Sequence, residues 1–249
     1  MFQIPNLPIT EDTMFSNNEL HQNYIKQGLA GLFNRSIISK KFSAAICSSL
    51  VNAIERRRAD YVFDWDIIRS SSLELVSIEV YDKKIEGNVA EFGVYRGEFA
   101  EKINKAFPER KLYLFDTFEG FNEKDVEIET SSKYSKRRHD FSKTNEEIVL
   151  QKMKFRENCI IRKGYFPETA NGIEDKFVFV SIDVDLYQPI YNGLKYFYPR
   201  LVKGGYIFVH DYNAQQYTGT KAAVKRYCEE ERITFFPLSD LGGSAIIMK

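Results

Sequence analysis

The sequence predicts an α/β protein with a parallel, Rossmann-like sheet flanked by helices. Short apolar runs alternate along the chain with segments of helical spacing, which is the order expected for a parallel sheet with crossover helices. The first apolar run leads directly into a glycine-containing turn. Later runs end in acidic residues or histidine, and ligands of open α/β sheets bind at that edge.

The clearest part of this pattern covers residues 88–121, NVAEFGVYRGEFAEKINKAFPERKLYLFDTFEGF. A short apolar strand ends at Gly93, and Gly97 follows just where a helical pattern begins. A second apolar strand ends in Asp116, about 23 residues beyond the first glycine. Two parallel strands joined by a helix would place this acid beside the glycine turn.

The remaining segments extend the pattern in both directions. Helices are predicted at 66–81, 142–155, 186–198 and 218–231, strands at 159–161, 177–185 and 206–209, and a terminal hairpin within 233–249. Residues 122–141 are polar and charged and predict a long surface loop, and residues 203–205 predict a turn. Helical spacing near the N-terminus predicts two or three more helices. We therefore expect an N-terminal helical cap over 1–65 and one α/β domain over 66–249.

Composition excludes several classes of protein. Lys plus Arg (35) balance Asp plus Glu (35), so the chain lacks the basic field that would hold a nucleic acid. Cys47, Cys159 and Cys228 are odd in number and far apart, which argues against a disulfide framework. The sequence shows neither a signal peptide pattern nor an apolar run long enough to span a membrane. We expect a cytoplasmic protein without a nucleic acid partner.

The glycine turn favours a nucleoside ligand without a phosphate. Glycines allow a ligand to approach the backbone, and Asp116 at the next strand end can accept hydrogen bonds from both ribose hydroxyls. The third glycine of the dinucleotide fingerprint is missing, and Glu91 would repel a pyrophosphate. S-adenosylmethionine fits this pattern, because it combines a ribose with an ammonium and a sulfonium group. A plain strand-to-helix turn is the alternative.

The third strand is predicted to end at Gly164, within the segment GYFPET. Its two aromatic residues, Tyr165 and Phe166, stand where they would flank an adenine. Packing in the core is an equally good interpretation.

A second group of polar residues follows the last two strands of the parallel sheet. Asp183 ends the most apolar strand, FVFVSIDVD, and His210 and Asp211 end the next one. Carboxylates and an imidazole from adjacent strand ends suit Mg²⁺, or Mn²⁺ because of the histidine. Such an ion would hold two substrate hydroxyls and lower the pKa of one of them. The alternative is that the aspartates cap the following helices and the histidine belongs to the core.

Several motifs in order, VAEFGVYRG, LYLFDTFEGF, GYFPET, SIDVDLY and YPRLVKGGYIFVHDY, resemble the macrocin O-methyltransferase family. The resemblance implies a class I methyltransferase that uses S-adenosylmethionine and Mg²⁺ to methylate sugar hydroxyls of antibiotics or glycans. It implies that the following residues bind the methionine end and the ribose of the cofactor: Glu91, Gly93, Tyr95, Gly97, Asp116, Thr117 and Phe118. Asp183 and Asp211 would bind the metal. His210 stands where the family usually has an aspartate, which leaves it as a ligand or a base.

The sequence thus predicts an O-methyltransferase acting on a sugar-containing small molecule or glycan, with Asp183 and His210 as catalytic residues. Paired subunits are an expectation from the family resemblance. The Asp183-Val184-Asp185 segment also matches the DxD motif of nucleotide-sugar glycosyltransferases, although Glu91 argues against that class. A third alternative is a methyltransferase fold that binds cofactor without turnover, which His210 would favour.

Overall fold

We describe a computed structural model of the chain that covers residues 32, 35–36, 66–135 and 139–249. The helices predicted between residues 1 and 65 lie outside the described residues, apart from those isolated positions. Chain contacts place residues 61–249 in one compact unit.

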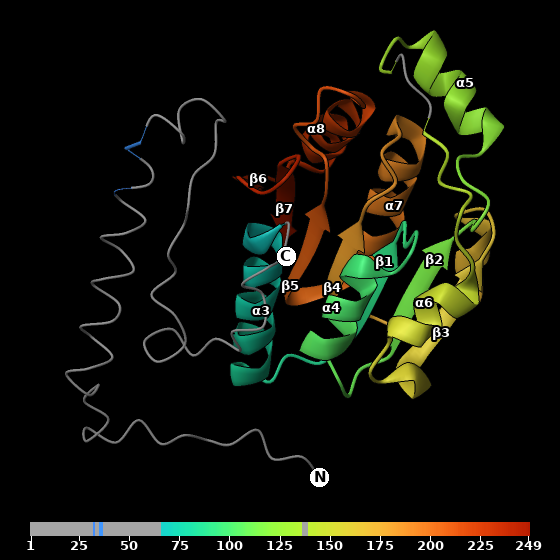
Figure 1. Cartoon of the computed structure of the whole chain (residues 1–249). Coiled ribbons are helices and arrows are strands. Elements are labelled where there is room, and N and C mark those ends of the chain that lie inside the picture. The colour runs from blue at the N-terminus through green and yellow to red at the C-terminus, as the bar shows by residue number, and fades with distance from the viewer. Residues whose placement is uncertain (1–31, 33–34, 37–65, 136–138) are drawn as a thin grey trace, which may run out of the picture. The chain divides into compact units, whose positions relative to one another are not determined.

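A seven-stranded sheet forms the centre of this unit (Figure 1). The strand order is β3-β2-β1-β4-β5-β7-β6, and β7 runs antiparallel to both of its neighbours, β5 and β6. The strands are β1 (Asn88–Phe92), β2 (Leu112–Asp116), β3 (Cys159–Lys163), β4 (Phe177–Ile182), β5 (Leu201–Val209), β6 (Phe235–Leu238) and β7 (Ser244–Met248). The five parallel strands and the terminal hairpin confirm the predicted fold class.

Helices cover both faces of the sheet, as expected for a parallel sheet buried on both sides. Figure 1 shows α3, α4 and α6 in front of it, and α7 and α8 behind it. The helices are α3 (Ile67–Asp82), α4 (Glu98–Ala106), α5 (Glu123–Ser131), α6 (Glu146–Lys152), α7 (Tyr187–Arg200) and α8 (Gly219–Glu231), with short 3-10 turns at Arg156–Asn158 and Glu168–Ala170. Successive strand residues alternate between two buried clusters: Val89 packs with the front helices and Ala90 with the rear ones.

The predicted loop at 122–141 is wrong in its first half, because α5 occupies Glu123–Ser131. Asn122 caps this helix by accepting a hydrogen bond from the amide of Lys124, and acidic residues occupy the first turn. The buried residues of α5 are Asp125 and Glu129. Since the inward face carries acids, the helix lacks the apolar periodicity by which helices are recognised in a sequence.

The predicted turn at 203–205 is also wrong. These residues lie within β5, beside an irregularity in its pairing with β4. A side chain at Gly205 would meet the carbonyl oxygen of Val178 at 3.0 Å, so this glycine permits close packing of the two strands.

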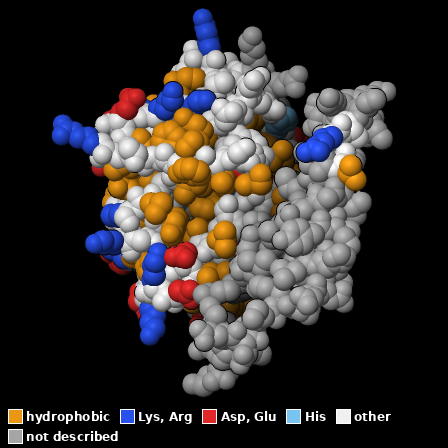
Figure 2. Space-filling model, turned by 90° about the vertical axis from the view of Figure 1, so that its left-hand side faces the viewer, with side chains coloured by type: hydrophobic (Ala, Val, Ile, Leu, Met, Phe, Trp, Pro, Cys, Tyr) orange, Lys and Arg blue, Asp and Glu red, His pale blue; other side chains and the backbone are white. Residues whose placement is uncertain are grey.

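The side of the unit shown in Figure 2 carries many hydrophobic side chains. Exposed apolar residues on α3 include Ile68 and Leu75, and Phe236 on the edge strand β6 is 64% exposed. In the part of the chain that the structure describes, no helix is long and apolar enough to cross a membrane.

Candidate active site

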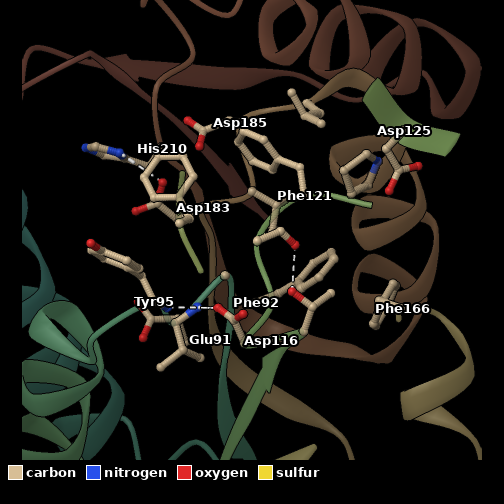
Figure 3. Close-up of a pocket in the computed structure, with 18 of the residues that line it drawn as sticks. Glu91, Phe92, Tyr95, Asp116, Phe121, Asp125, Phe166, Asp183, Asp185 and His210 are labelled. Atoms are coloured by element: carbon tan, nitrogen blue, oxygen red, sulfur yellow. Dashed lines mark hydrogen bonds and ion pairs between the residues drawn. The ribbon is translucent and has the colours of Figure 1, made fainter. Parts of the chain in front are cut away.

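A cavity of about 340 Å³ lies at the carboxyl ends of the central strands. Figure 3 shows side chains from several strand ends pointing into it. Ten of the predicted site residues line this cavity: Glu91, Gly93, Tyr95, Asp116, Thr117, Gly164, Phe166, Asp183, His210 and Asp211. Two do not: Gly97 is the left-handed N-cap of α4, and Phe118 is buried in the core with 4% exposure. Residues far apart in sequence thus meet in one site.

Gly93 is required because the chain crosses β4 closely at this point. Its φ is 91°, and a Cβ atom here would lie 2.0 Å from the carbonyl oxygen of Asp183. Tyr95 also has a positive φ, 48°, which is unusual for a non-glycine residue. The glycine turn therefore brings the predicted cofactor-binding loop close to the backbone of Asp183, the predicted metal ligand.

Asp116 organises the same turn through its carboxylate. Oδ2 accepts hydrogen bonds from the backbone amides of Val94 and Tyr95, both at 2.8 Å, and Oδ1 accepts one from Phe118 at 2.7 Å. A carboxylate oxygen has two lone pairs, so Oδ1 retains capacity for a ribose hydroxyl. The acid thus holds the glycine turn in shape and also faces the cavity.

Glu91 is a buried acid without a neutralising contact. Its side chain lies in the cavity wall with 2% exposure, and its Oε2 atom has no hydrogen-bond partner among the described residues. Burial raises the pKa of Glu91 well above its ordinary value. An ammonium group in the cavity would supply the missing partner, so this observation fits the methionine end of S-adenosylmethionine.

Asp183 lies between two cationic groups. Its Oδ2 accepts a hydrogen bond from Arg69 Nη1 at 2.9 Å, and its Oδ1 lies 3.2 Å from His210 Nδ1. Burial opposes ionisation, but His210 and Arg69 together hold the pKa of Asp183 below its ordinary value. Arg69 comes from α3 and also donates to Ser181 at 2.9 Å. No motif in the sequence singles out this arginine.

His210 has carboxylates on both sides of its ring. Nδ1 faces Asp183 and lies 3.5 Å from Asp211 Oδ2, whereas Nε2 lies 3.6 Å from Asp66 Oδ2. Burial disfavours the charged ring, yet the nearby Asp183 raises the pKa of His210 to about 12. The structure thus places the imidazole between acids on both sides of its ring.

The donor set fits a divalent ion. Ligand atoms of Asp183, His210 and Asp211 lie within 4.8 Å of one another. A neutral His210 would offer Nδ1 to the ion and direct its Nε2 proton to Asp66, an arrangement that commonly orients histidine ligands. Arg69 would hold the remaining oxygen of Asp183. The cluster thus provides both ligand atoms and outer partners.

Sequence reasoning considered Asp185 only as part of a DxD motif, yet it lines the cavity beside the cluster. Burial raises the pKa of Asp185 well above its ordinary value, and neighbouring Asp183 and Asp211 add to the effect. Its φ of 59° is a second sign of a constrained functional residue. The signal in the sequence was a second acid at the end of a buried strand.

Phe166 packs in the core, which was one of the two interpretations of the GYFPET segment, and it also lines the cavity. Its side chain is 3% exposed, and its ring lies 4.4 Å from that of Phe92. Aromatic residues from the loops complete the wall. The ring centroids of Phe121 and Phe141 lie 5.1 Å apart, and the ring centroid of Tyr95 lies 5.4 Å from that of Phe141.

The Rossmann-like sheet with its antiparallel β7, together with this cavity, defines an S-adenosylmethionine-dependent methyltransferase of class I. The Macrocin-O-methyltransferase (TylF) family matches residues 68–249, and the chain belongs to this O-methyltransferase family. The predicted family and enzyme class are thereby confirmed.

Solved methyltransferase structures share the fold. The O-methyltransferase NovP is 21% identical, with a TM-score of 0.59 over 74% of this chain and 80% of its own. The calicheamicin methyltransferase CalS11 is 19% identical, with a TM-score of 0.57 over 94% of this chain and 93% of its own. No curated protein sequence matches the chain.

Proposed function

We propose that the chain transfers the methyl group of S-adenosylmethionine to a sugar hydroxyl, in a site that also holds a divalent ion. One observation carries the proposal: the glycine turn and the Asp183, His210 and Asp211 cluster line a single cavity. In methyl transfer, the acceptor oxygen forms a bond to the methyl carbon as the carbon–sulfur bond breaks. The acceptor proton must pass to a base.

The cofactor would lie along the ends of β1 and β2. Glu91 would pair with the ammonium group, Gly93 and Tyr95 would border the methionine chain, and Asp116 would accept from the ribose. This orientation follows from the unpaired oxygen of Glu91 and from the position of Asp116 at the neighbouring strand end. The sulfonium is thereby directed toward Asp183.

Asp183, His210 and Asp211 would hold Mg²⁺ or Mn²⁺. When bound, such an ion orients neighbouring hydroxyls and lowers the pKa of the reacting one. His210 must lose a proton to become a ligand, which makes it a poor candidate for the base.

Asp185 is the better candidate for the proton acceptor. Asp183 is neutralised by Arg69 and His210, and this makes its carboxylate a weak base. Asp185 lines the same cavity and has a raised pKa, so its ionised form binds a proton more strongly.

A sugar acceptor is supported by the family and by a relative. One structure of CalS11, 17% identical to this chain with a TM-score of 0.51, is described as a TDP-rhamnose 3'-O-methyltransferase. Aromatic walls of the kind formed by Phe121 and Phe141 suit sugar rings, since they stack on the apolar face of the ring. A cytoplasmic location remains our prediction.

The test is to incubate the protein with S-adenosylmethionine and a panel of nucleotide sugars and glycosides, and to detect methylated products by mass spectrometry. We expect a product that gains one methyl group and depends on a divalent ion. Asp185→Asn should lower kcat by about 100-fold or more at saturating substrate. The exposed Glu127→Gln is the matched control. Turnover unaffected by EDTA would contradict the metal proposal, and full activity of Asp185→Asn would contradict the assigned base.

A further inference from the structure

The position of the adenine follows from the strand order and rests on the proposed function. With the methionine end at β1 and the ribose at Asp116 on β2, the base must extend toward β3, the next strand outward. The end of β3 contributes Gly164, Tyr165 and Phe166 to the cavity wall. These residues offer no carboxylate or amide side chain that could recognise a base.

A carboxylate reaches this end of the cavity from α5 instead. Figure 3 shows Asp125 on the same side as Phe166, whereas His210 lies at the opposite side. Asp125 lines the cavity and is 4% exposed. Its Oδ1 accepts a hydrogen bond from the Tyr165 hydroxyl at 3.0 Å, and its Oδ2 has no hydrogen-bond partner among the described residues.

Among the described residues, the carboxylate of Asp125 takes no part in an ion pair that would stabilise the fold. No Lys, Arg or His side chain in the described part of the chain forms an ion pair with it, and burial raises its pKa. The second buried acid of α5, Glu129, also has one paired oxygen, Oε2, which accepts from the amide of Tyr187 at 2.9 Å, but Glu129 does not line the cavity. Asp125 thus keeps one acceptor oxygen for a donor inside the cavity.

We propose that Asp125 reads the adenine of the cofactor by accepting a hydrogen bond from the exocyclic 6-amino group. Tyr165 positions the carboxylate by holding its other oxygen. A 6-oxo purine presents an acceptor at the same position and would be repelled by the carboxylate. Asp125 is therefore a specificity-determining residue for the cofactor.

The test compares S-adenosylhomocysteine with S-inosylhomocysteine, its 6-oxo analogue, by calorimetry on the full chain. The wild-type protein should bind the adenosyl ligand about 10-fold or more tightly than the inosyl ligand. In Asp125→Asn the amide can donate to the 6-oxo group, so the preference should fall by about 10-fold or reverse. Asp125→Ala should weaken binding of the adenosyl ligand and spare the inosyl ligand. Glu127→Gln, an exposed change on the same helix, should leave the ratio unchanged.

A ratio of dissociation constants is measured on one protein sample, so a smaller folded fraction does not alter it. If both Asp125 variants bind the two ligands with the wild-type ratio, Asp125 has only a structural role and the inference is overturned. If the wild-type protein binds neither ligand, the proposed function fails as well, which separates the two outcomes.

Discussion

At the scale of single residues, the carboxylates of the site are of two kinds: some have a charged partner in the protein, and others have an oxygen available to a ligand. Arg69 and His210 neutralise Asp183, whereas one oxygen each of Glu91 and Asp125 remains without a partner in the described structure. Buried acids of this second kind are costly to the fold, and ligands with donor groups relieve that cost.

Replacing Glu91 with Gln should weaken binding of S-adenosylhomocysteine by about 10-fold or more, because a hydrogen bond to a charged partner is lost. The free energy of unfolding should stay the same or rise, since the change removes a buried ionisable group. Calorimetry and urea unfolding measure the two quantities. The exposed Glu109→Gln is the control, and unchanged affinity in Glu91→Gln would refute the assigned contact.

Asp175 gives a pH-dependent prediction away from the cavity. The Tyr113 hydroxyl donates to Asp175 at 2.5 Å, with Asn88 at 2.9 Å and Lys111 at 3.5 Å, and Tyr113 first among them lowers the pKa of Asp175. A lowered pKa in the folded state stabilises the fold above the unfolded pKa of about 4, and the contribution is lost as pH falls through the folded value.

Asp175→Asn should therefore cost about 1 kcal/mol at pH 7 and progressively less below about pH 4. Urea unfolding of both proteins across this pH range measures the difference. A cost that does not change with pH would show that the carboxylate charge contributes nothing.

At the scale of elements, the sequence predicted those parts of the fold that have apolar periodicity. The strands β1 to β5 and the helices α4, α7 and α8 were located because their buried faces are largely apolar. Helix α3 was located from apolar residues that include the exposed Ile68 and Leu75, whereas its buried face includes polar residues such as Arg69. Helix α5 was missed because it buries acids. The site residues Arg69 and Asp125 were missed because they reach the cavity from helices, and only the folded sheet brings those helices to the strand ends.

The turn after β1 should be intolerant of any side chain. In Gly93→Ala the added Cβ would meet Asp183 backbone at 2.0 Å, and we expect a loss of about 3 kcal/mol or more, or failure to fold. Gly172→Ala is a matched control, because its φ is 77° but nothing lies within 4 Å of the added atom. It should cost only about 1 kcal/mol from backbone strain. Similar losses in both variants would contradict the close approach.

At the scale of the whole molecule, the parallel sheet brings two separate groups of functional residues to one edge. In the proposed function, the turn after β1 and the acid after β2 bind the cofactor, and the residues at the ends of β4 and β5 bind the ion. The sequence predicted that these residues lie at the ligand-binding edge of the sheet, whereas the ion pairing around His210 required the folded structure.

The ion prediction can be tested without an acceptor. Asp183→Asn and Asp211→Asn should each weaken Mn²⁺ binding by about 10-fold or more, measured by electron paramagnetic resonance. Asp240 belongs to a second cluster with Asp66 and His210, so Asp240→Asn is the discriminating control and should bind like wild type. Loss of binding in Asp240→Asn alone would place the ion in the other cluster.

The most direct test of the central claim is calorimetric binding of S-adenosylmethionine, S-adenosylhomocysteine and a UDP-sugar, each with EDTA, Mg²⁺ or Mn²⁺. We predict micromolar binding of both adenosyl ligands, retained in EDTA because Glu91 and Asp116 do not belong to the proposed ion cluster. Binding of the UDP-sugar alone, and only with Mn²⁺, would contradict the account.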